Sequence, residues 1–587
     1  MGLRLALKKL WLLRNILIVV LVPLLLSPIP TLVGSKEAKC AYCILLIAIF
    51  WISEALPIAV TALLPLVLFP MLGVAEAKSI AGNYVNNTSM LFVGGLIVAI
   101  SIETWNLHKR IALHTLLIFG TEPKRLLFGL MFTTWFLSMW ISNTATTSMM
   151  LPIADAILEQ LKNADVNLND PDREGEELDK LTVLEKTERS VGTDEKSSAL
   201  MKESFSSRNF TKDKSYTRLC KTVSLAIAYA ANTGGTASLT GTGPNLVLKG
   251  QSDMLYHAAG LPSVVTFATW MMFGLPLAFV NLIIIWVWLI IFQLHRCRLK
   301  SCVGTKVSKN DTKVRNIIEQ QLKALGPISF AQVLIGFCFV LLVLLWITRD
   351  LQQAGGWRLL FKPKYVTDAT PAIFVAVLLF ILPSNISFFT RKGYRQDFGD
   401  WTPILNWRTA EKKLPWGIVL VLGGGFAIAD VSRVSGLSAE ISRQLSVLST
   451  MKPWVMSLVL SFLVSLLTEI TSNVATASIL MPIMEQMAIS MGMHPLYLMF
   501  PAALACSFAF MLPVATAPNT IIFSTGHLKV VDMVSAGFFI NLVCVFTLTL
   551  AVHTWGELIF HFSEVPSAFL INANTTVNAT TALNGGH

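Results

Sequence analysis

Apolar runs long enough to cross a lipid bilayer recur along the whole of this chain. A helix that spans a hydrocarbon core of roughly 30 Å needs about 20 apolar residues. The sequence has 587 residues, of which 54% are hydrophobic and only 14% charged, and its mean hydropathy is +0.62. Water-soluble domains cannot bury that much apolar surface, and lipid requires backbone groups to be satisfied within helices. We therefore expect an all-α polytopic membrane protein.

Eleven of these runs predict transmembrane helices, at 15–33, 40–57, 59–74, 88–106, 218–256, 262–293, 329–348, 369–390, 415–444, 495–526 and 530–554. The first run follows several basic residues, as the core of a signal peptide would. It is long, however, and no small-residue cleavage site follows it, so we interpret it as a span.

A phrase of twelve residues occurs twice in the chain. It reads SNTATTSMMLPI at 142–153 and SNVATASILMPI at 472–483, with seven identical positions. Each copy interrupts an apolar run, at 124–160 and at 452–489. A backbone opened at membrane depth is tolerated only where it is buried in protein or lines a cavity. We therefore expect each run to form a re-entrant hairpin.

A second pair of motifs follows the hairpins. The stretches ANTGGTASLTGTGPN at 231–245 and CSFAFMLPVATAPN at 506–519 both end in Thr, then Gly or Ala, then Pro-Asn, and each predicts a break inside a span. Five predicted crossings separate the two hairpins, so the hairpins should enter from opposite faces. This order is typical of inverted repeats in secondary transporters, which bind substrate and ions between discontinuous helices. Helix packing alone would explain any single glycine, but not the duplicated phrase.

The polar groups of these motifs suit a cation and an anion. A hard cation such as sodium takes oxygen ligands, which Asn143, Asn473 and the carbonyl groups at the two breaks would supply. The opened helix N-termini carry partial positive charge and free N–H groups, which suit a carboxylate. None of the four motifs contains Lys or Arg. We therefore expect anion binding to depend on co-bound sodium.

The distribution of basic residues predicts the orientation of the chain. The segment 295–325 carries eight Lys and Arg residues against two acidic ones, which is typical of a cytoplasmic loop. The N-terminus and the loop 161–217 then lie on the same side, and the C-terminus lies outside. Glycosylation sequons at Asn574 and Asn578 agree with this orientation. Topology thus explains the net charge of +11, and we expect no nucleic-acid partner.

These observations predict a division of the chain into eight segments. They are a cytoplasmic N-terminus (1–14), a first repeat half (15–160), a disordered cytoplasmic loop (161–217), a broken helix with the following span (218–293), a basic cytoplasmic loop (294–328), a second repeat half (329–489), a broken helix with the last span (490–554) and an extracellular glycosylated tail (555–587).

Four acidic residues near the predicted spans are candidates for ion or proton binding. They are Glu54, Glu103, Asp430 and Glu469. An ionisable group at membrane depth is functional by default, but each of these lies near an estimated span end or a hairpin arm, where a structural hydrogen bond is the alternative. Cys40 and Cys43 form the one CxxC motif, and without a second pair we do not expect a metal or redox site.

Several stretches together resemble the divalent anion/sodium symporter family, which contains the sodium-coupled di- and tricarboxylate and sulfate carriers. They include KEAKCAY, SEALPIAVTALLP, WNLHKRIAL, LSMWISNTAT, LPWGIVLVLGGGFA, TSNVAT, HPLYLMFPA and GHLKVVDM. The resemblance extends from about residue 15 to about residue 560. It implies a homodimer, in which each protomer has a scaffold domain and a transport domain that moves across the membrane like an elevator.

The same resemblance implies site residues. A first sodium site would involve Ser138, Ser142, Asn143 and Gly243. A second would involve Thr468, Ser472, Asn473 and Ala517. Substrate carboxylates would meet Ser142, Asn143, Thr144, Thr242, Gly417, Ser472, Asn473, Val474 and Thr516. Sodium is then the only metal, carried together with the substrate, and we expect no cofactor.

The motif variants favour one class of substrate. The sulfate branch typically reads SNTST and TGTSTN, whereas this chain reads SNTAT and TGTGPN, which favours carboxylates. Gly243 and Gly417 are typical of citrate-preferring members and would leave room for a third carboxylate arm, although two glycines also fit plain helix packing. Ala517 stands where carboxylate carriers usually have proline. We expect citrate in preference to succinate.

Other functions fit the sequence less well. A channel would need a pore lined by charged or carbonyl rings, and no such ring is visible. No HExxH, GxSxG or GxxxxGK[ST] motif indicates an enzyme or a nucleotide-driven pump. The sequence therefore predicts an electrogenic sodium/carboxylate symporter of the plasma membrane. A sulfate symporter of the same family and a sodium-independent carboxylate exchanger are the alternatives.

Overall fold

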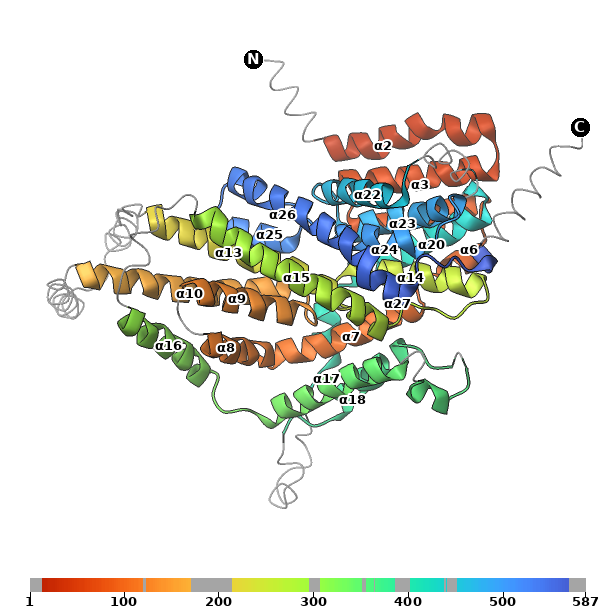
Figure 1. Cartoon of the computed structure of the whole chain (residues 1–587). Helices are drawn as coiled ribbons and strands as arrows, with labels where there is room; N and C mark the ends of the chain where they lie inside the picture. Colours follow the sequence, from red (N-terminus) through yellow and green to blue (C-terminus); the bar gives the residue numbers. More distant parts are fainter. Residues whose placement is uncertain are drawn as a thin grey trace, which may run out of the picture.

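The computed structural model describes residues 13–119, 123–169, 214–294, 307–350, 355–363, 365–385, 402–437, 440 and 451–569. Within these ranges the regular structure is helical, with one isolated β-bridge between Pro383 and Pro403 (Figure 1). By length and composition, six described segments can cross a membrane: Arg14–Val33, Ala77–Thr104, Phe267–Phe292, Phe330–Arg349, Trp416–Val434 and Val530–Phe560. The chain is therefore an all-α multi-pass membrane protein, as its composition predicts.

The first half of the chain runs as far as α15. Its helices before the first hairpin are α2 (Arg14–Leu26), η1 (Ile29–Val33), α3 (Lys36–Ser53), α4 (Ile58–Thr61), α5 (Pro65–Met71), α6 (Ala77–Gly82), α7 (Asn87–Thr104) and α8 (Leu107–Phe119). The remaining helices of this half are α9 (Pro123–Ser138), α10 (Asn143–Asn169), α13 (Lys214–Ala237), α14 (Gly243–Ala258) and α15 (Phe267–Leu294).

The amphipathic α16 (Val307–Ala324) connects the two halves. The second half opens with α17 (Phe330–Arg349), η3 (Trp357–Leu360), α18 (Ala369–Ile381), α19 (Trp407–Lys413) and α20 (Trp416–Val434). It ends with α22 (Pro453–Leu467), α23 (Asn473–Ser490), α24 (Leu496–Ala505), α25 (Ala517–Ser524), α26 (Val530–Ala551), η7 (Val552–Gly556) and α27 (Glu557–Phe560).

Four helix interruptions lie where the duplicated motifs predict them. The first hairpin breaks at 139–142, between α9 and α10, and the second at 468–472, between α22 and α23. The runs 218–256 and 495–526 are each divided by a non-helical stretch, at 238–242 and 506–516. The breaks are thus confirmed, whereas the re-entrant course of the hairpins stays a prediction.

Other predicted boundaries were wrong in detail. The run 59–74 is divided at Pro65, which begins α5 after the short α4, and the apolar stretch Ile58–Met71 is shorter than the segments that can cross a membrane. The segment 161–217 is not wholly a loop, since α10 continues to Asn169 and α13 begins at Lys214, and the loop 294–328 contains α16. Residues 555–569 of the predicted tail pack on the core through Phe560, Phe562 and Phe569, all buried. Asn574 and Asn578 lie outside the described residues.

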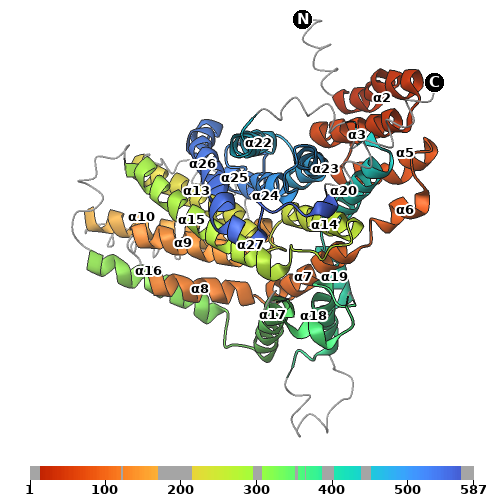
Figure 2. The same ribbon diagram turned by 45° about the vertical axis from the view of Figure 1, so that its right-hand side comes forward.

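Each hairpin packs against a broken helix of the other half. In the first half α13 lies against α9, α10 and α15, and α10 also contacts α25 of the second half. In the reverse direction α14 contacts α23 and α24. Figure 2 shows α9, α10, α13 and α15 on the left, α14, α23 and α24 in the middle, and α7, α17 and α18 below them. The two halves are therefore interleaved and do not form separate bodies side by side.

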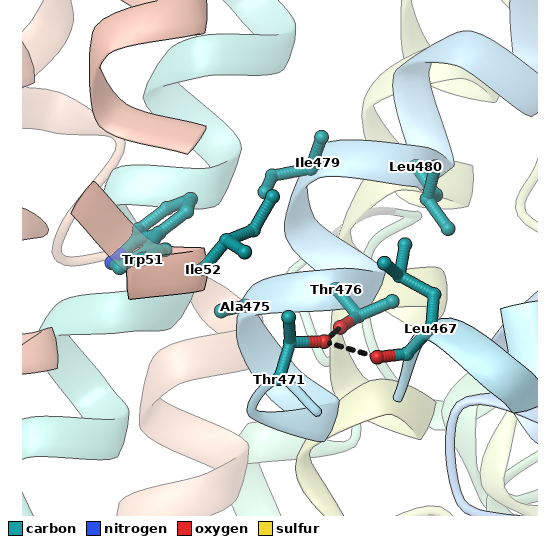
Figure 3. Close-up of a pocket in the computed structure, with 8 residues that line it drawn as sticks. All are labelled: Trp51, Ile52, Leu467, Thr471, Ala475, Thr476, Ile479 and Leu480. Atoms are coloured by element: carbon teal, nitrogen blue, oxygen red, sulfur yellow. Dashed lines mark hydrogen bonds between the residues drawn. The ribbon is translucent and has the colours of Figure 1, made fainter. Parts of the chain in front are cut away.

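A small cavity of about 40 Å³ lies between α3 and the second hairpin (Figure 3). Its lining residues are Trp51, Ile52, Leu467, Thr471, Ala475, Thr476, Ile479 and Leu480. The hydroxyl groups of Thr471 and Thr476 bond to each other at 2.5 Å, so neither points a free donor into the cavity. None of the lining residues is charged. It is an apolar packing defect and unsuited to a carboxylate.

The contact between α9 and α13 depends on a glycine. A Cβ at Gly234 would lie 2.3 Å from the carbonyl oxygen of Trp135, so the two backbones could not approach as they do. We predict that Gly234→Ala destabilises the protein by about 1–3 kcal/mol, because overpacking forces the backbones apart. Thermal unfolding of the purified protein in detergent measures this. Gly82→Ala is the matched control, since nothing lies within 4 Å of its Cβ position. Equal melting temperatures for the two variants would contradict this packing.

Candidate functional site

Three oxygen atoms meet where α9 ends and α10 begins. The hydroxyl of Ser138 lies 2.6 Å from Oδ1 of Asn143 and 2.8 Å from the carbonyl oxygen of Ala231 in α13. A serine hydroxyl has one hydrogen to donate, and neither acceptor carries any. Only one of the two close oxygen pairs can then be a full hydrogen bond at a given moment. The buried Ser138 thus stands in an oxygen cluster that a cation would stabilise.

The second hairpin repeats this arrangement. The hydroxyl of Thr468 lies 2.7 Å from Oδ1 of Asn473 and 2.8 Å from the carbonyl oxygen of Cys506. Thr468 and Asn473 stand 330 positions after Ser138 and Asn143, the offset of the duplicated phrase. Both clusters combine a hydroxyl, an amide oxygen and a main-chain carbonyl. These are oxygen donors of the kind that hard cations take.

An asparagine side chain closes the break next to each cluster. Nδ2 of Asn245 donates to the carbonyl oxygens of Gly235 and Ser238, at 3.0 and 2.8 Å. Nδ2 of Asn519 donates in the same way to Ala509 and Leu512, at 3.0 and 2.9 Å. Both asparagines are fully buried. Each asparagine therefore satisfies carbonyl groups that the interrupted helix leaves without partners.

Several helices begin at the breaks with uncapped N-termini. The residues before α14, α23 and α25 are Thr242, Ser472 and Thr516, and none of their side chains accepts a hydrogen bond from its own helix. At α10, Oγ of Ser142 accepts from the N–H of Ala145 at 3.3 Å. Free first-turn N–H groups and the positive end of the helix dipole suit an anionic ligand. Such a group can be a carboxylate.

These N-termini are linked across the two halves. A Cβ at Gly243 would lie 2.3 Å from Cγ2 of Val474, so α14 begins in contact with the tip of the second hairpin. Nδ2 of Asn232 in α13 donates to Oγ1 of Thr516 at 3.2 Å. Further along the same helix pair, Gln251 of α14 donates to the buried Glu485 of α23 at 2.5 Å. The motifs of the two halves are therefore in contact with each other.

The predicted site residues differ in their access to solvent. Ser142, Thr144 and Ala517 are exposed, whereas Ser138, Gly243 and Thr468 are buried. The remaining residues are half-buried: Asn143, Thr242, Gly417, Ser472, Asn473, Val474 and Thr516. The oxygen clusters thus lie behind a surface of hydroxyl groups and helix ends. A ligand on that surface would cover the oxygen clusters behind it.

The expectation that Gly243 and Gly417 leave room for a third carboxylate arm is wrong. The space that a methyl group at position 243 would fill is already taken by Val474. Gly417 lies in the first turn of α20, where a Cβ would meet only Cβ of Ala59, at 3.4 Å. The structure therefore gives Gly417 no described contact with either hairpin. Neither glycine opens an empty space beside the motifs.

The four acidic candidates have different environments. Glu54 is exposed at the end of α3, Glu103 pairs with Lys413 at 2.9 Å, and Asp430 accepts from Nδ2 of Asn83 at 3.2 Å. Glu469 is buried, with 2% of its surface exposed, and adjoins Thr468 at the tip of the second hairpin. It is the one candidate that the structure joins to the predicted sites. The thiols of Cys40 and Cys43 are buried and free.

Sequence reasoning missed the contributions of several residues. Ala231 and Cys506 contribute only main-chain carbonyl groups, for which their side chains give no signal. Asn232 is a further missed residue, although it belongs to the ANTGG stretch of the first break. Asn245 and Asn519 could have been recognised, because they are the shared last residue of the two break motifs.

Comparisons with known proteins identify the family of the chain. Residues 8–562 match the model of the sodium:sulfate symporter transmembrane region. The chain is 44% identical to the Na(+)/citrate cotransporter of Rattus norvegicus, over 96% of this chain and 98% of the relative. It is 43% identical to solute carrier family 13 member 2 of Homo sapiens, over 98% of each chain. It is 39% identical to the Na(+)/dicarboxylate cotransporter 3 of Mus musculus, over 98% of this chain and 97% of that one. The chain therefore belongs to the sodium:sulfate symporter family, whose members are transporters and not enzymes.

Proposed function

We propose that this protein is a sodium-coupled symporter of di- and tricarboxylates. The observation that carries the proposal is the duplicated oxygen cluster beside uncapped helix N-termini, at Ser138 and Asn143 and again at Thr468 and Asn473. Each cluster would hold one sodium ion. The names of the relatives support the same activity, because they describe cotransport of sodium with citrate or dicarboxylate.

The substrate would bind in front of the two cations. Its carboxylates would meet the first-turn N–H groups of α14, α23 and α25 and the hydroxyl groups of Ser142, Thr144, Thr242, Ser472 and Thr516. No Lys or Arg stands in the four motifs, so sodium ions and helix dipoles would have to neutralise the anion. Substrate affinity would then require sodium. Citrate and succinate are both candidates, and sulfate is the alternative substrate within the family.

The membrane potential would contribute to uphill transport. Moving one net charge across the membrane is worth roughly 2.3 kcal/mol per 100 mV. If more positive charge enters with sodium than negative charge with the carboxylate, transport is electrogenic and driven inward in a cell with a negative interior. This would suit a carrier of the plasma membrane.

We assign both hairpins and their broken helices to one moving transport domain, because each half packs into the other through α10–α25 and α14–α23. Helices α3–α7 and α17–α20 would form the scaffold. Movement of the transport domain past the scaffold would expose the site to each side in turn, as an elevator does. The common end of α10, α13 and α16, on the left in Figure 1, would face the cytoplasm. Eleven crossings, a homodimer and glycosylation at Asn574 and Asn578 belong to the same proposal.

Uptake by the purified protein in liposomes tests the function directly. We expect labelled citrate and succinate to accumulate only with an inward sodium gradient, and the membrane voltage to change as they enter. Sulfate is measured in parallel, with liposomes lacking protein as the control. Preference for sulfate would favour the alternative substrate. Carboxylate uptake that ignores sodium would favour an exchanger and contradict the cation sites.

The two cation sites predict a shared mutant phenotype. Asn143→Ala and Asn473→Ala each remove an amide oxygen from a cluster, so each should abolish sodium-dependent uptake while leaving the amount of protein at the cell surface unchanged. Ser148→Ala and Ser490→Ala are matched controls, because these hydroxyl groups bond only to carbonyls of their own helices. Normal transport by either asparagine variant would contradict the corresponding cation site.

The moving transport domain predicts an inhibitory cross-link. A Cβ at Gly95 in α7 would lie 3.8 Å from Cβ of Thr240 in the first break, close to the roughly 3.8 Å typical of disulfides. We expect the double variant Gly95→Cys/Thr240→Cys to lose uptake on oxidation and to regain it with a reductant. Each single variant is a control. Full activity in a protein shown to be cross-linked would mean that α7 and the break do not move apart.

A further inference from the structure

Glu469 is a buried carboxylate that no cation neutralises among the described residues. Its Oε1 accepts from the N–H groups of Phe510 and Met511, and its Oε2 from those of Met511 and Leu512, at 2.8–3.1 Å. Nδ2 of Asn541 in α26 also donates to Oε1 at 2.8 Å. These neutral donors satisfy the oxygens but bring no positive charge. None of the described ion pairs includes this carboxylate.

Three further oxygen atoms in the same region are buried and have no partner. They are Oη of Tyr229, Oδ1 of Asn232 and Oδ1 of Asn541. The three residues are at most 2% exposed. The ring of Tyr229 packs edge-on against Phe510, with ring centroids 5.2 Å apart, and Phe510 donates its N–H to Glu469. A buried polar atom without a partner is uncommon, and these three belong to residues that contact Glu469 or the break whose N–H groups bind it.

The orientation of both amides is set by their neighbours. Nδ2 of Asn541 faces the Glu469 carboxylate, which only accepts hydrogen bonds. Nδ2 of Asn232 faces the carbonyl oxygen of Ala509 at 3.3 Å, which also only accepts. Exchanging oxygen and nitrogen in either amide would bring two acceptors together. The unpartnered Oδ1 atoms are therefore acceptors in a region that already carries negative charge.

We propose that this cluster is a third sodium site, with Tyr229, Asn232 and Asn541 supplying oxygen ligands and Glu469 the opposite charge. The proposal rests on the sodium symport proposed above and adds one cation to it. A carboxylate inside a membrane protein normally marks an ion path or has an ionic partner, and sodium would be that partner here. The ion would link α13, α26 and the tip of the second hairpin.

The first half lacks an equivalent site. Met139 stands 330 positions before Glu469, and the corresponding break is tied instead by the Ser238 hydroxyl, which donates to the carbonyl oxygen of Met139 at 2.5 Å. The third cation thus has no symmetric partner. Its transport would add one positive charge to each cycle without adding a negative one.

Tyr229→Phe tests the site cleanly, because the hydroxyl that it removes has no partner in the protein. In liposomes we expect the sodium concentration for half-maximal citrate or succinate uptake to rise about tenfold, which corresponds to about 1.4 kcal/mol. At sodium concentrations too low to fill the weakened site, we also expect the charge moved per labelled substrate to fall by about one elementary charge, as one cation fewer crosses with each substrate. Tyr256→Phe is the control: this tyrosine is also buried, but its hydroxyl bonds to His494 at 3.0 Å, and sodium dependence should not change.

The outcomes separate this proposal from the one on which it rests. If wild-type uptake is sodium-coupled and Tyr229→Phe keeps both the sodium dependence and the charge ratio, the cluster holds a water molecule and the third site is wrong. If wild-type uptake ignores sodium, both proposals are overturned. A binding measurement gives a second readout, namely protection of the detergent-purified protein from thermal unfolding by sodium alone. The double variant Asn143→Ala/Asn473→Ala should retain part of this protection, and adding Tyr229→Phe should remove it.

Discussion

An opened helix in an apolar core is stable only if freed backbone groups find partners, and in this protein one asparagine binds freed carbonyl groups at each of the two broken helices. Asn245 binds one carbonyl group in the last turn of α13 and one in the loop that follows, and Asn519 binds two carbonyl groups of the loop that leads into its own helix. Without these bonds, each break would leave buried acceptors unsatisfied at a cost of about 1–3 kcal/mol per group. With the loops held in this way, the next helices begin at fixed points, and the hydroxyl, amide and carbonyl oxygens are brought together.

The sequence predicted the parts of this arrangement that repeat. The duplicated dodecamer located both hairpins, and the shared Pro-Asn ending located both breaks. These features depend on side chains that occur twice in the sequence. The breaks fall at 139–142, 238–242, 468–472 and 506–516. The class of protein followed from hydropathy alone, since no soluble fold accommodates so many long apolar runs.

The rest depends on which backbones approach each other, and local sequence does not determine that. Ala231 and Cys506 reach the oxygen clusters only through carbonyl groups, so their residue types carry no chemical signal. Gly243 looks like a means of enlarging a binding site, but the structure fills its space with Val474 from the opposite half. The run 59–74 resembles a span by hydropathy, yet it is divided at Pro65 into two short helices. In each case a long-range contact or a backbone constraint overrides the local pattern.

The contact between Gly243 and Val474 means that the residue types at these two positions, far apart in the sequence, constrain each other. A methyl group at 243 fits only if the side chain at 474 becomes smaller or turns away, because the present separation would be 2.3 Å. Evolution could therefore not change one position freely while the other stayed fixed. Among relatives, the two residues should exchange bulk in concert, and an attempt to graft the substrate preference of one carrier onto another would have to transfer them as a pair.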